Sequence, residues 1–416
     1  MSQEFFLLGS IIVIGFFSLM FFERTKIPDV LFLILLGVLL GPVLHVVDAS
    51  PTSLISQLLP FVGTLALIIL LFDGGINLNI FKVVKELGKA SVFTLLVFLL
   101  ALFFVGFAMK ILAGWQLVEG LLLGAVIGGS SSAVVVSIIS KISMPEENKT
   151  VLTLESALTD ALCVIATFTL LGIIVSNSLD ISRVGNQLAS AFSIAFMVAA
   201  AFAIVWIVVL QRFYGKPFGF LLTIAVLFIM YAFVESIGGN GAIAVLVFGV
   251  LLSSMQELAK LLKIEGDFGL EKKLREFQVE ISFFVRTFFF VYLGLIINFA
   301  DLPPNVIILS TVLLILIFLS RYLGVRLLSQ LFTDSRQNIL IISMMPRGLA
   351  AAVLAFIPAS AAYGVKLPYF SELVFLIIIY TNVIATVGVY AYESGSQGAK
   401  PRIVATAQHR YPYSKK

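Results

Sequence analysis

Residues 128–160, GGSSSAVVVSIISKISMPEENKTVLTLESALTD, decide how this chain folds. Two apolar runs, 121–127 and 133–139, meet there at a Gly-Gly-Ser-Ser-Ser sequence, which a continuous membrane helix has no reason to contain. The apolar segment that follows carries two carboxylates, Glu155 and Asp160. Because burying an ionisable group in a bilayer costs roughly 2.5 to 3.5 kcal/mol even on lenient scales, these acids indicate a functional site beside a broken helix.

The composition predicts an all-α polytopic membrane protein. The chain has 416 residues, of which 60% are hydrophobic and 12% are charged, and its mean hydropathy is +1.11. Apolar runs of roughly 18 residues or more, long enough to cross a bilayer core, recur along its length. The single cysteine, Cys163, excludes an intramolecular disulfide, and His45 and His409 lie too far apart to suggest a metal site. We therefore expect no cofactor.

Thirteen transmembrane helices account for the apolar runs, and the fifth and twelfth are discontinuous. We place them at 4–22, 28–46, 54–73, 90–109, 116–142, 148–175, 187–211, 217–236, 241–255, 278–298, 304–328, 337–358 and 369–392. The polar stretch 254–276 between spans nine and ten is either a cytoplasmic interface helix or a solvated linker. The membrane domain is thus 1–393, followed by a short basic tail at 394–416.

The basic residues predict the orientation of the spans. With the N-terminus outside, the cytoplasmic loops, the helix ends that flank them and the tail hold 22 of the 27 lysines and arginines. The external side holds three (Lys110, Arg183 and Lys366), and Arg286 and Arg347 fall within spans. The net charge of +4 is therefore a signature of topology, and nothing supports a nucleic-acid partner. We expect a multi-pass protein of the plasma or inner membrane with a cytoplasmic C-terminus.

A weak internal repeat predicts two inverted halves. Three matched pairs keep nearly one offset: GVLL at 37–40 and 249–252, Gly75 and Gly294, and the breaks at Ser130 and 346–348. The offset corresponds to seven spans, an odd number, so the second half is inverted relative to the first. An inverted repeat of this kind places two broken helices against each other near the midplane, where transporter sites are built.

The first break supplies oxygen atoms for a small cation. The freed carbonyls and the hydroxyls of Ser130, Ser131 and Ser132 are hard ligands, and Asp160 supplies the charge. On the following helix Ser156 shares a face with Asp160 because the two are four residues apart. The sequence therefore predicts a site for a small cation at Asp160 and the oxygens around the break, without choosing among the three serines.

The two acids are predicted to have different roles. Glu155 shares a face with Thr159, and it points roughly 140° away from Asp160 at helical pitch. An arginine at membrane depth can neutralise one acid, and we predict that Arg347 pairs with Glu155 as a structural ion pair. Asp160 then remains unpaired in a cavity, where it can hold a cation or a proton but not both.

Two further charged residues are possible accessories. Arg286 could be a snorkelling residue, a second counter-charge or a gate component, and the sequence does not choose among these roles. Asp73 is interpreted as a charge at the cytoplasmic end of span three rather than as a ligand.

Six stretches between Lys26 and Tyr390 resemble the monovalent cation/proton antiporters, in particular the NhaP-type sodium/proton antiporters. They are KIPDVLFLILLGVLLGP (26–42), LFDGGINL (71–78), GAVIGGSSSAVVV (124–136), ESALTDA (155–161), FFVRTFFFVYLGLIIN (283–298) and MPRGLAAAVLAF (345–356). The resemblance implies a homodimer among membrane lipids, with a dimerisation part and a moving six-helix core at about 90–175 and 304–392. It also implies electroneutral exchange, with Asp160 as the ion and proton carrier, Ser156 and Ser130 as ligands, and Glu155 with Arg347 as the structural pair.

The chain departs from this family at two places. The family's usual Asn-Asp pair is Thr159-Asp160 here, and its usual Thr-Asp-Pro is Ser130-Ser131-Ser132. With no acid directly before Asp160, one-for-one exchange is favoured, while the serine-rich break looks more like the potassium-linked branch. We predict an antiporter that exchanges Na+ or Li+ for H+, with K+/H+ exchange as the alternative.

Two other classes of protein are weaker alternatives. A channel or another secondary carrier would use the acid as a gate, and a channel would show no competition between cations and protons. A membrane enzyme could use a serine of the break as its nucleophile. No general base stands at a plausible spacing from that break, however, so we do not expect an enzyme.

Overall fold

The computed structural model is helical throughout the part of the chain that it describes. The described residues are 2–25, 27–47, 54–76, 80–142, 144–176, 181–212, 219–255, 257–258, 270–297, 302–328, 337–360 and 363–396, and no strand occurs among them. The all-α class predicted from the composition is therefore confirmed.

The helices follow the predicted apolar runs closely. In order they are α1 (Ser2–Thr25), α2 (Asp29–Val38), the π-helix η1 (Leu39–Val43), α3 (Leu54–Ile76), α4 (Ile80–Leu112), α5 (Leu117–Ile127), α6 (Ser132–Ile139), α7 (Glu146–Ser176), α8 (Ile181–Arg212), α9 (Gly219–Ser236), α10 (Gly241–Ser253), α12 (Leu270–Ile296), α13 (Pro304–Leu327), α14 (Asn338–Ser343), α15 (Leu349–Leu354) and α16 (Phe370–Ser396).

Local sequence signals fix several helix starts. A capping box begins α5, because the side chains of Gln116 and Glu119 each accept a bond from the other's backbone N–H. Asn240 caps α10 through its side-chain oxygen. Pro304 occupies the first position of α13, where proline's missing N–H costs nothing.

Eight of the described helices are long and apolar enough to cross a membrane, and four shorter helices are also apolar. Each predicted span coincides with a helix or with an interrupted pair, of which α5/α6 and α14/α15 are the predicted discontinuous ones. The count of thirteen crossings stays a prediction. Residues 270–276 of the polar linker form the start of α12, whereas 259–269 and the tail beyond Ser396 lie outside the described residues.

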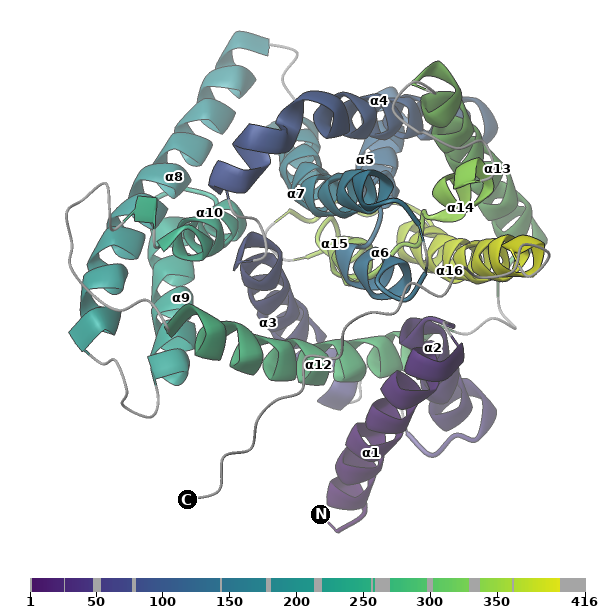
Figure 1. The fold of residues 1–416 in the computed structure, drawn as a ribbon, viewed down its shortest axis with the longest axis horizontal. Coiled ribbons are helices and arrows are strands. Elements are labelled where there is room, and N and C mark those ends of the chain that lie inside the picture. The colour runs from purple at the N-terminus through teal and green to yellow at the C-terminus, as the bar shows by residue number, and fades with distance from the viewer. Residues whose placement is uncertain are drawn as a thin grey trace.

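The helices pack into two groups. Helices α4 to α7 and α13 to α16 pack mainly on one another, while α1 to α3, α8 to α10 and α12 form the second group. Figure 1 shows the first group at the upper right and the second along the left and the bottom of the view, where α12 runs from α9 toward α2. The main contacts between them come from α15, which packs against α3, and from α7, which packs against α3, α8 and α10.

The glycines of the predicted repeat meet at two helix crossings within the second group. A Cβ on Gly37 of α2 would lie 2.7 Å from the Cα of Gly294 on α12, and a Cβ on Gly75 of α3 would lie 3.0 Å from the Cα of Gly249 on α10. Each crossing joins one half of the repeat to the other. Only glycine allows backbones to approach so closely, so the repeated residues set the packing of the two halves.

Candidate functional site

The first break joins α5 to α6 across Gly128, Gly129, Ser130 and Ser131. This backbone lies directly on α7: a Cβ on Gly129 would come within 2.6 Å of Cys163 Sγ and within 3.0 Å of Thr159 Cβ. The glycine is therefore required for close approach. The consequence is that the serines beside it are held against the acid-bearing face of α7.

The second break, between α14 and α15, crosses the first. The N–H of Ser131 donates to the carbonyl of Pro346 at 2.7 Å, so one break supplies a backbone partner for the other. A Cβ on Gly348 would overlap the side chain of Ser131. The prediction that two discontinuous helices face each other is confirmed.

Asp160 lies on α7 beside the start of α6 and is half-buried. Its Oδ2 accepts a hydrogen bond from the hydroxyl of Ser132 at 2.7 Å and lies 3.4 Å from the N–H of Ser132. Within the described residues no lysine or arginine forms an ion pair with this carboxylate, and the described ion pairs involve other acids. Asp160 is thus held by a helix start and a hydroxyl rather than by a fixed cation.

The other predicted ligands lie around the same break but contact one another. The N–H of Ser130 donates to Thr159 Oγ1 at 3.1 Å, and its hydroxyl donates to Glu155 Oε1 at 2.9 Å. The hydroxyl of Ser156 donates to the carbonyl of Thr153 at 3.1 Å. All of these side chains except Thr153 are buried. The hydroxyl that contacts Asp160 belongs to Ser132, one of the three serines of the break, whereas the ligands that the family resemblance implies are Ser130 and Ser156.

The predicted ion pair of Glu155 with Arg347 is wrong in its partner. Arg321 of α13 places Nη1 3.1 Å from Glu155 Oε1 and Nη2 3.2 Å from Oε2, and both side chains are almost completely buried. The Nε of Arg321 donates to the carbonyl of Ile341 at 2.7 Å. Both terminal nitrogens of the planar guanidinium thus bond to the two carboxylate oxygens, which is the strong bidentate geometry. The sequence predicts Arg321 to flank the cytoplasmic side, because it lies near the end of its span.

Arg347 is instead committed to backbone carbonyls. Its Nε donates to Ile127 at 2.6 Å, its Nη2 to Gly128 at 3.3 Å and its Nη1 to Met345 at 2.9 Å. The first two carbonyls end the half-helix α5, where an interrupted helix leaves acceptors without partners. The second break therefore supplies the positive charge that the C-terminal end of α5 requires.

The accessory residues separate from each other in the structure. Arg286 of α12 lies 3.3 Å from Asp29 at the start of α2, within the second group of helices and away from the two breaks. Asp73 lies near the end of α3 and is half-buried, and α3 packs against α7, the helix that carries Asp160.

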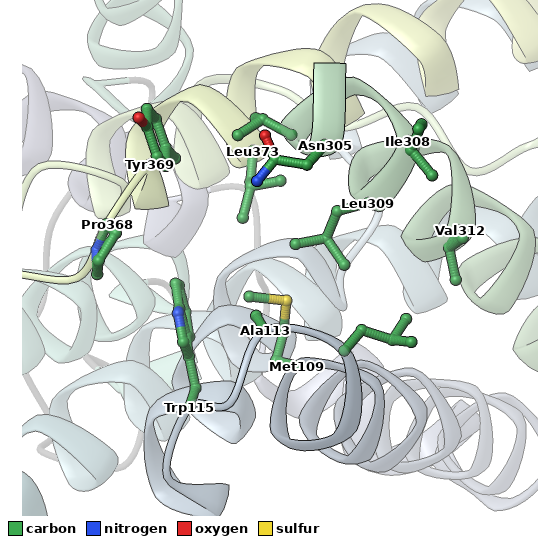
Figure 2. Close-up of a pocket in the computed structure, with 12 residues that line it drawn as sticks. Met109, Ala113, Trp115, Asn305, Ile308, Leu309, Val312, Pro368, Tyr369 and Leu373 are labelled. Carbon is green, nitrogen blue, oxygen red and sulfur yellow. The ribbon is translucent and has the colours of Figure 1, made fainter. Parts of the chain in front are cut away.

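No resident metal centre is apparent from the described side chains, since no group of three His, Cys, Asp or Glu residues could hold one. A pocket of about 510 Å³ lies elsewhere, where the end of α4 meets the starts of α13 and α16. Figure 2 shows Met109, Leu309 and Leu373 among the apolar side chains that line it. None of the predicted site residues lines this pocket, so it is separate from the two breaks.

Two crossing half-helix pairs beside a half-buried carboxylate, in a chain of apolar helices, are typical of a secondary transporter. The chain belongs to the sodium/hydrogen exchanger family: residues 10–391 match the family described as "Sodium/hydrogen exchanger, transmembrane". The resemblance drawn from the sequence motifs is confirmed.

Individual relatives agree with this family. The chain is 26% identical over 357 residues to Na(+)/H(+) antiporter 1 of Methanocaldococcus jannaschii, covering 84% of this chain and 81% of that protein. It is 24% identical over 385 residues to the K(+)/H(+) antiporter NhaP of Alkalimonas amylolytica, covering 89% and 63% of the two chains. These relatives are transporters, so the prediction that the chain is not an enzyme is confirmed.

The fold also matches a solved antiporter structure. The sodium proton antiporter MjNhaP1 from Methanocaldococcus jannaschii at pH 8 superposes with a TM-score of 0.75 at 20% identity, covering 95% of this chain and 97% of that one. At this identity the match concerns the fold, and it confirms the antiporter fold that the motif resemblance implies.

Proposed function

We propose that this protein exchanges a monovalent cation, Na+ or Li+ in the first place, for H+ at Asp160. The observation that carries the proposal is the environment of this carboxylate: it is half-buried at the crossing of two broken helices and has no arginine partner in the described residues. An acid in that position takes up either a metal cation or a proton. Competition for one site that opens alternately to the two sides of the membrane couples the two fluxes as antiport.

The neighbouring acid supports this division of roles. Glu155 is neutralised by Arg321, and it also accepts from the hydroxyl of Ser130. Separating a buried carboxylate from a bidentate arginine partner is strongly unfavourable, so this carboxylate does not exchange its counter-ion for a transported cation. We therefore assign Glu155 to the structure and Asp160 to transport.

Oxygen ligands for the cation are available on both sides of Asp160. Ser156 lies one helical turn before it, and Ser130, Ser131 and Thr159 bring hydroxyls and carbonyls to the break. We propose that the bound ion draws on this set, with Asp160, Ser156 and Ser130 as its principal ligands. Hard oxygen donors suit small monovalent cations.

Transport would proceed by movement of a core of six spans, about 90–175 and 304–392, against the remaining helices. The packing of the helices into two groups supports this division. The half-helix α15 packs against α3, and Phe356, just beyond α15, lies 6.2 Å from the ring of Phe289 on α12. The main contacts of α6 and α14 are with helices of their own group. With the N-terminus outside, this asymmetry corresponds to a site closed on the outer side and open toward the cytoplasm.

We further propose a homodimer in the plasma or inner membrane, with the C-terminus in the cytoplasm. Large apolar side chains on α8 and α9 are exposed in the single chain, including Met197 at 71% and Ile229 at 61%. Lipids or a second copy of the chain would cover them. The homodimer is tested by cross-linking in native membranes.

K+/H+ exchange remains the second candidate. Relatives named for Na+ and for K+ transport are both similar to this chain, and the serine-rich break supports the potassium alternative.

Because Thr159 stands directly before Asp160, the site has one carboxylate at this point, which supports electroneutral exchange of one cation for one proton. A channel would give currents far above the turnover of a carrier.

The test is cation-driven proton flux in proteoliposomes made from the purified protein, with Na+, Li+ and K+ compared in parallel. We expect Asp160→Asn to abolish the flux while the variant still folds and elutes like the wild type. Exchange at the wild-type rate in Asp160→Asn would refute the proposed site. Equal flux with all three cations would refute selectivity for Na+.

A further inference from the structure

Ser132 begins the half-helix α6 and contacts Asp160 twice. Its hydroxyl donates to Asp160 Oδ2 at 2.7 Å, and its N–H lies 3.4 Å from the same oxygen. Both donors come from the N-terminal end of a helix, which carries partial positive charge. One oxygen of the transport carboxylate is therefore already partly neutralised by the protein itself.

We propose that Ser132 is a positioning residue that competes with the transported cation for the charge of Asp160; this inference rests on the proposed role of Asp160. The donors repel a cation from Oδ2, so the cation approaches through Oδ1. The structure gives Oδ1 no hydrogen-bond donor among the described residues. Ser132 thus fixes which oxygen faces the ion and how strongly that oxygen attracts it.

The direction of the effect follows from the strength of the hydrogen bond. A hydrogen bond to an ionised group is stronger than one to a neutral group. When a cation binds, it neutralises the carboxylate and weakens the bond from Ser132. The cation-free state therefore gains more from Ser132 than the cation-bound state does. The serine lowers the affinity for the cation, which helps the ion to leave.

Three substitutions separate the two donors. Ser132→Ala removes the hydroxyl and keeps the N–H, whereas Ser132→Pro removes both. Proline is well tolerated at the first position of a helix, and Ser131 before it has the extended backbone (φ −75°, ψ 116°) that a proline requires. Ser132→Thr keeps both donors and should behave like the wild type.

Ser137→Ala is the matched control. Ser137 lies on the same half-helix, and its hydroxyl donates at 2.6 Å to the carbonyl of Ala133 in its own helix. The substitution removes the same atom from α6 without touching Asp160. Any general effect of a lost hydroxyl on the half-helix will appear in this variant.

The experiment measures KM and kcat for Na+ and then K+ with the full chain in proteoliposomes, at a pH high enough that protons no longer affect KM. We expect Ser132→Ala to lower KM by about fivefold and Ser132→Pro to lower it further, without a rise in kcat. Ser132→Thr and Ser137→Ala should keep the wild-type KM. A purely structural role would reduce folded protein or kcat and leave KM unchanged.

Two outcomes overturn the inference. A higher KM in Ser132→Ala would make the hydroxyl a ligand of the cation, and an unchanged KM would remove it from the site. If Asp160→Asn is inactive while the Ser132 variants keep the wild-type KM, only this inference fails. If Asp160→Asn still exchanges cations, the proposed function fails as well.

Discussion

The two broken helices cross at one point but carry different residues there. The first break is made of glycines and serines, while the second has Pro346, Arg347 and Gly348. In the structure, the start of α6 after the first break faces Asp160, and the guanidinium of the second break caps the carbonyls of Ile127 and Gly128 at the end of α5. An inverted repeat can therefore keep its geometry while one break faces the carboxylate proposed for transport and the other neutralises a helix end.

The arginines show the same division more sharply. Arg321 neutralises a carboxylate, and Arg347 neutralises carbonyls. Both are buried, and both stand within the group of helices that holds Asp160. Their loss should therefore destabilise the protein for different reasons, and compensating substitutions can tell those reasons apart.

The largest effect is expected for Arg321→Met. The substitution leaves Glu155 as an uncompensated buried charge, which costs about 3 to 5 kcal/mol of unfolding free energy. Unfolding of the purified protein in detergent measures the loss. In the Glu155→Gln background the same substitution should cost far less, because no charge remains to be neutralised. A loss below about 1 kcal/mol in the single variant would contradict the ion pair.

A smaller loss, about 2 to 4 kcal/mol, is expected for Arg347→Met, which leaves buried carbonyls of the two breaks without a donor. Here Glu155→Gln should give no recovery, because the guanidinium of Arg347 bonds to Ile127, Gly128 and Met345. The losses of unfolding free energy in Arg347→Met and in Glu155→Gln should therefore add in the double variant. If the double variant is instead more stable than Arg347→Met alone, Glu155 pairs with Arg347, as the sequence predicts.

Local signals explain what could be predicted from the sequence. Glycines and serines inside an apolar run indicate a helix break whatever the tertiary packing. A carboxylate in a membrane span indicates a site because of the free energy that its burial in the bilayer costs. The breaks at Ser130 and Arg347, and the unpaired state of Asp160, follow from such signals. The repeated glycines were also visible, since the offset between Gly75 and Gly294 survives in the residues themselves.

Contacts between distant helices explain what was missed. Arg321 lies five residues before Arg326, more than one helical turn deeper in the span, and that depth was the available signal. Its partner depends on how α13 packs against α4, α14 and α16, which the sequence does not encode locally. Likewise, three consecutive serines offered three hydroxyls for Asp160. The choice of Ser132 depends on the irregular backbone of the break.

The smallest effect is expected for Arg286→Gln, which tests whether ion pairs outside the two breaks matter for transport. Arg286 and Asp29 lie 3.3 Å apart; the arginine side chain is 21% exposed, so solvent weakens the pair, whereas the Asp29 side chain is 6% exposed. We expect a loss of about 1 to 2 kcal/mol in unfolding free energy and an unchanged KM for Na+ in proteoliposomes. If KM changes while stability does not, the charge of Arg286 acts on the ion. In that case α12 would belong to the ion site at the two breaks and not only to the supporting group of helices.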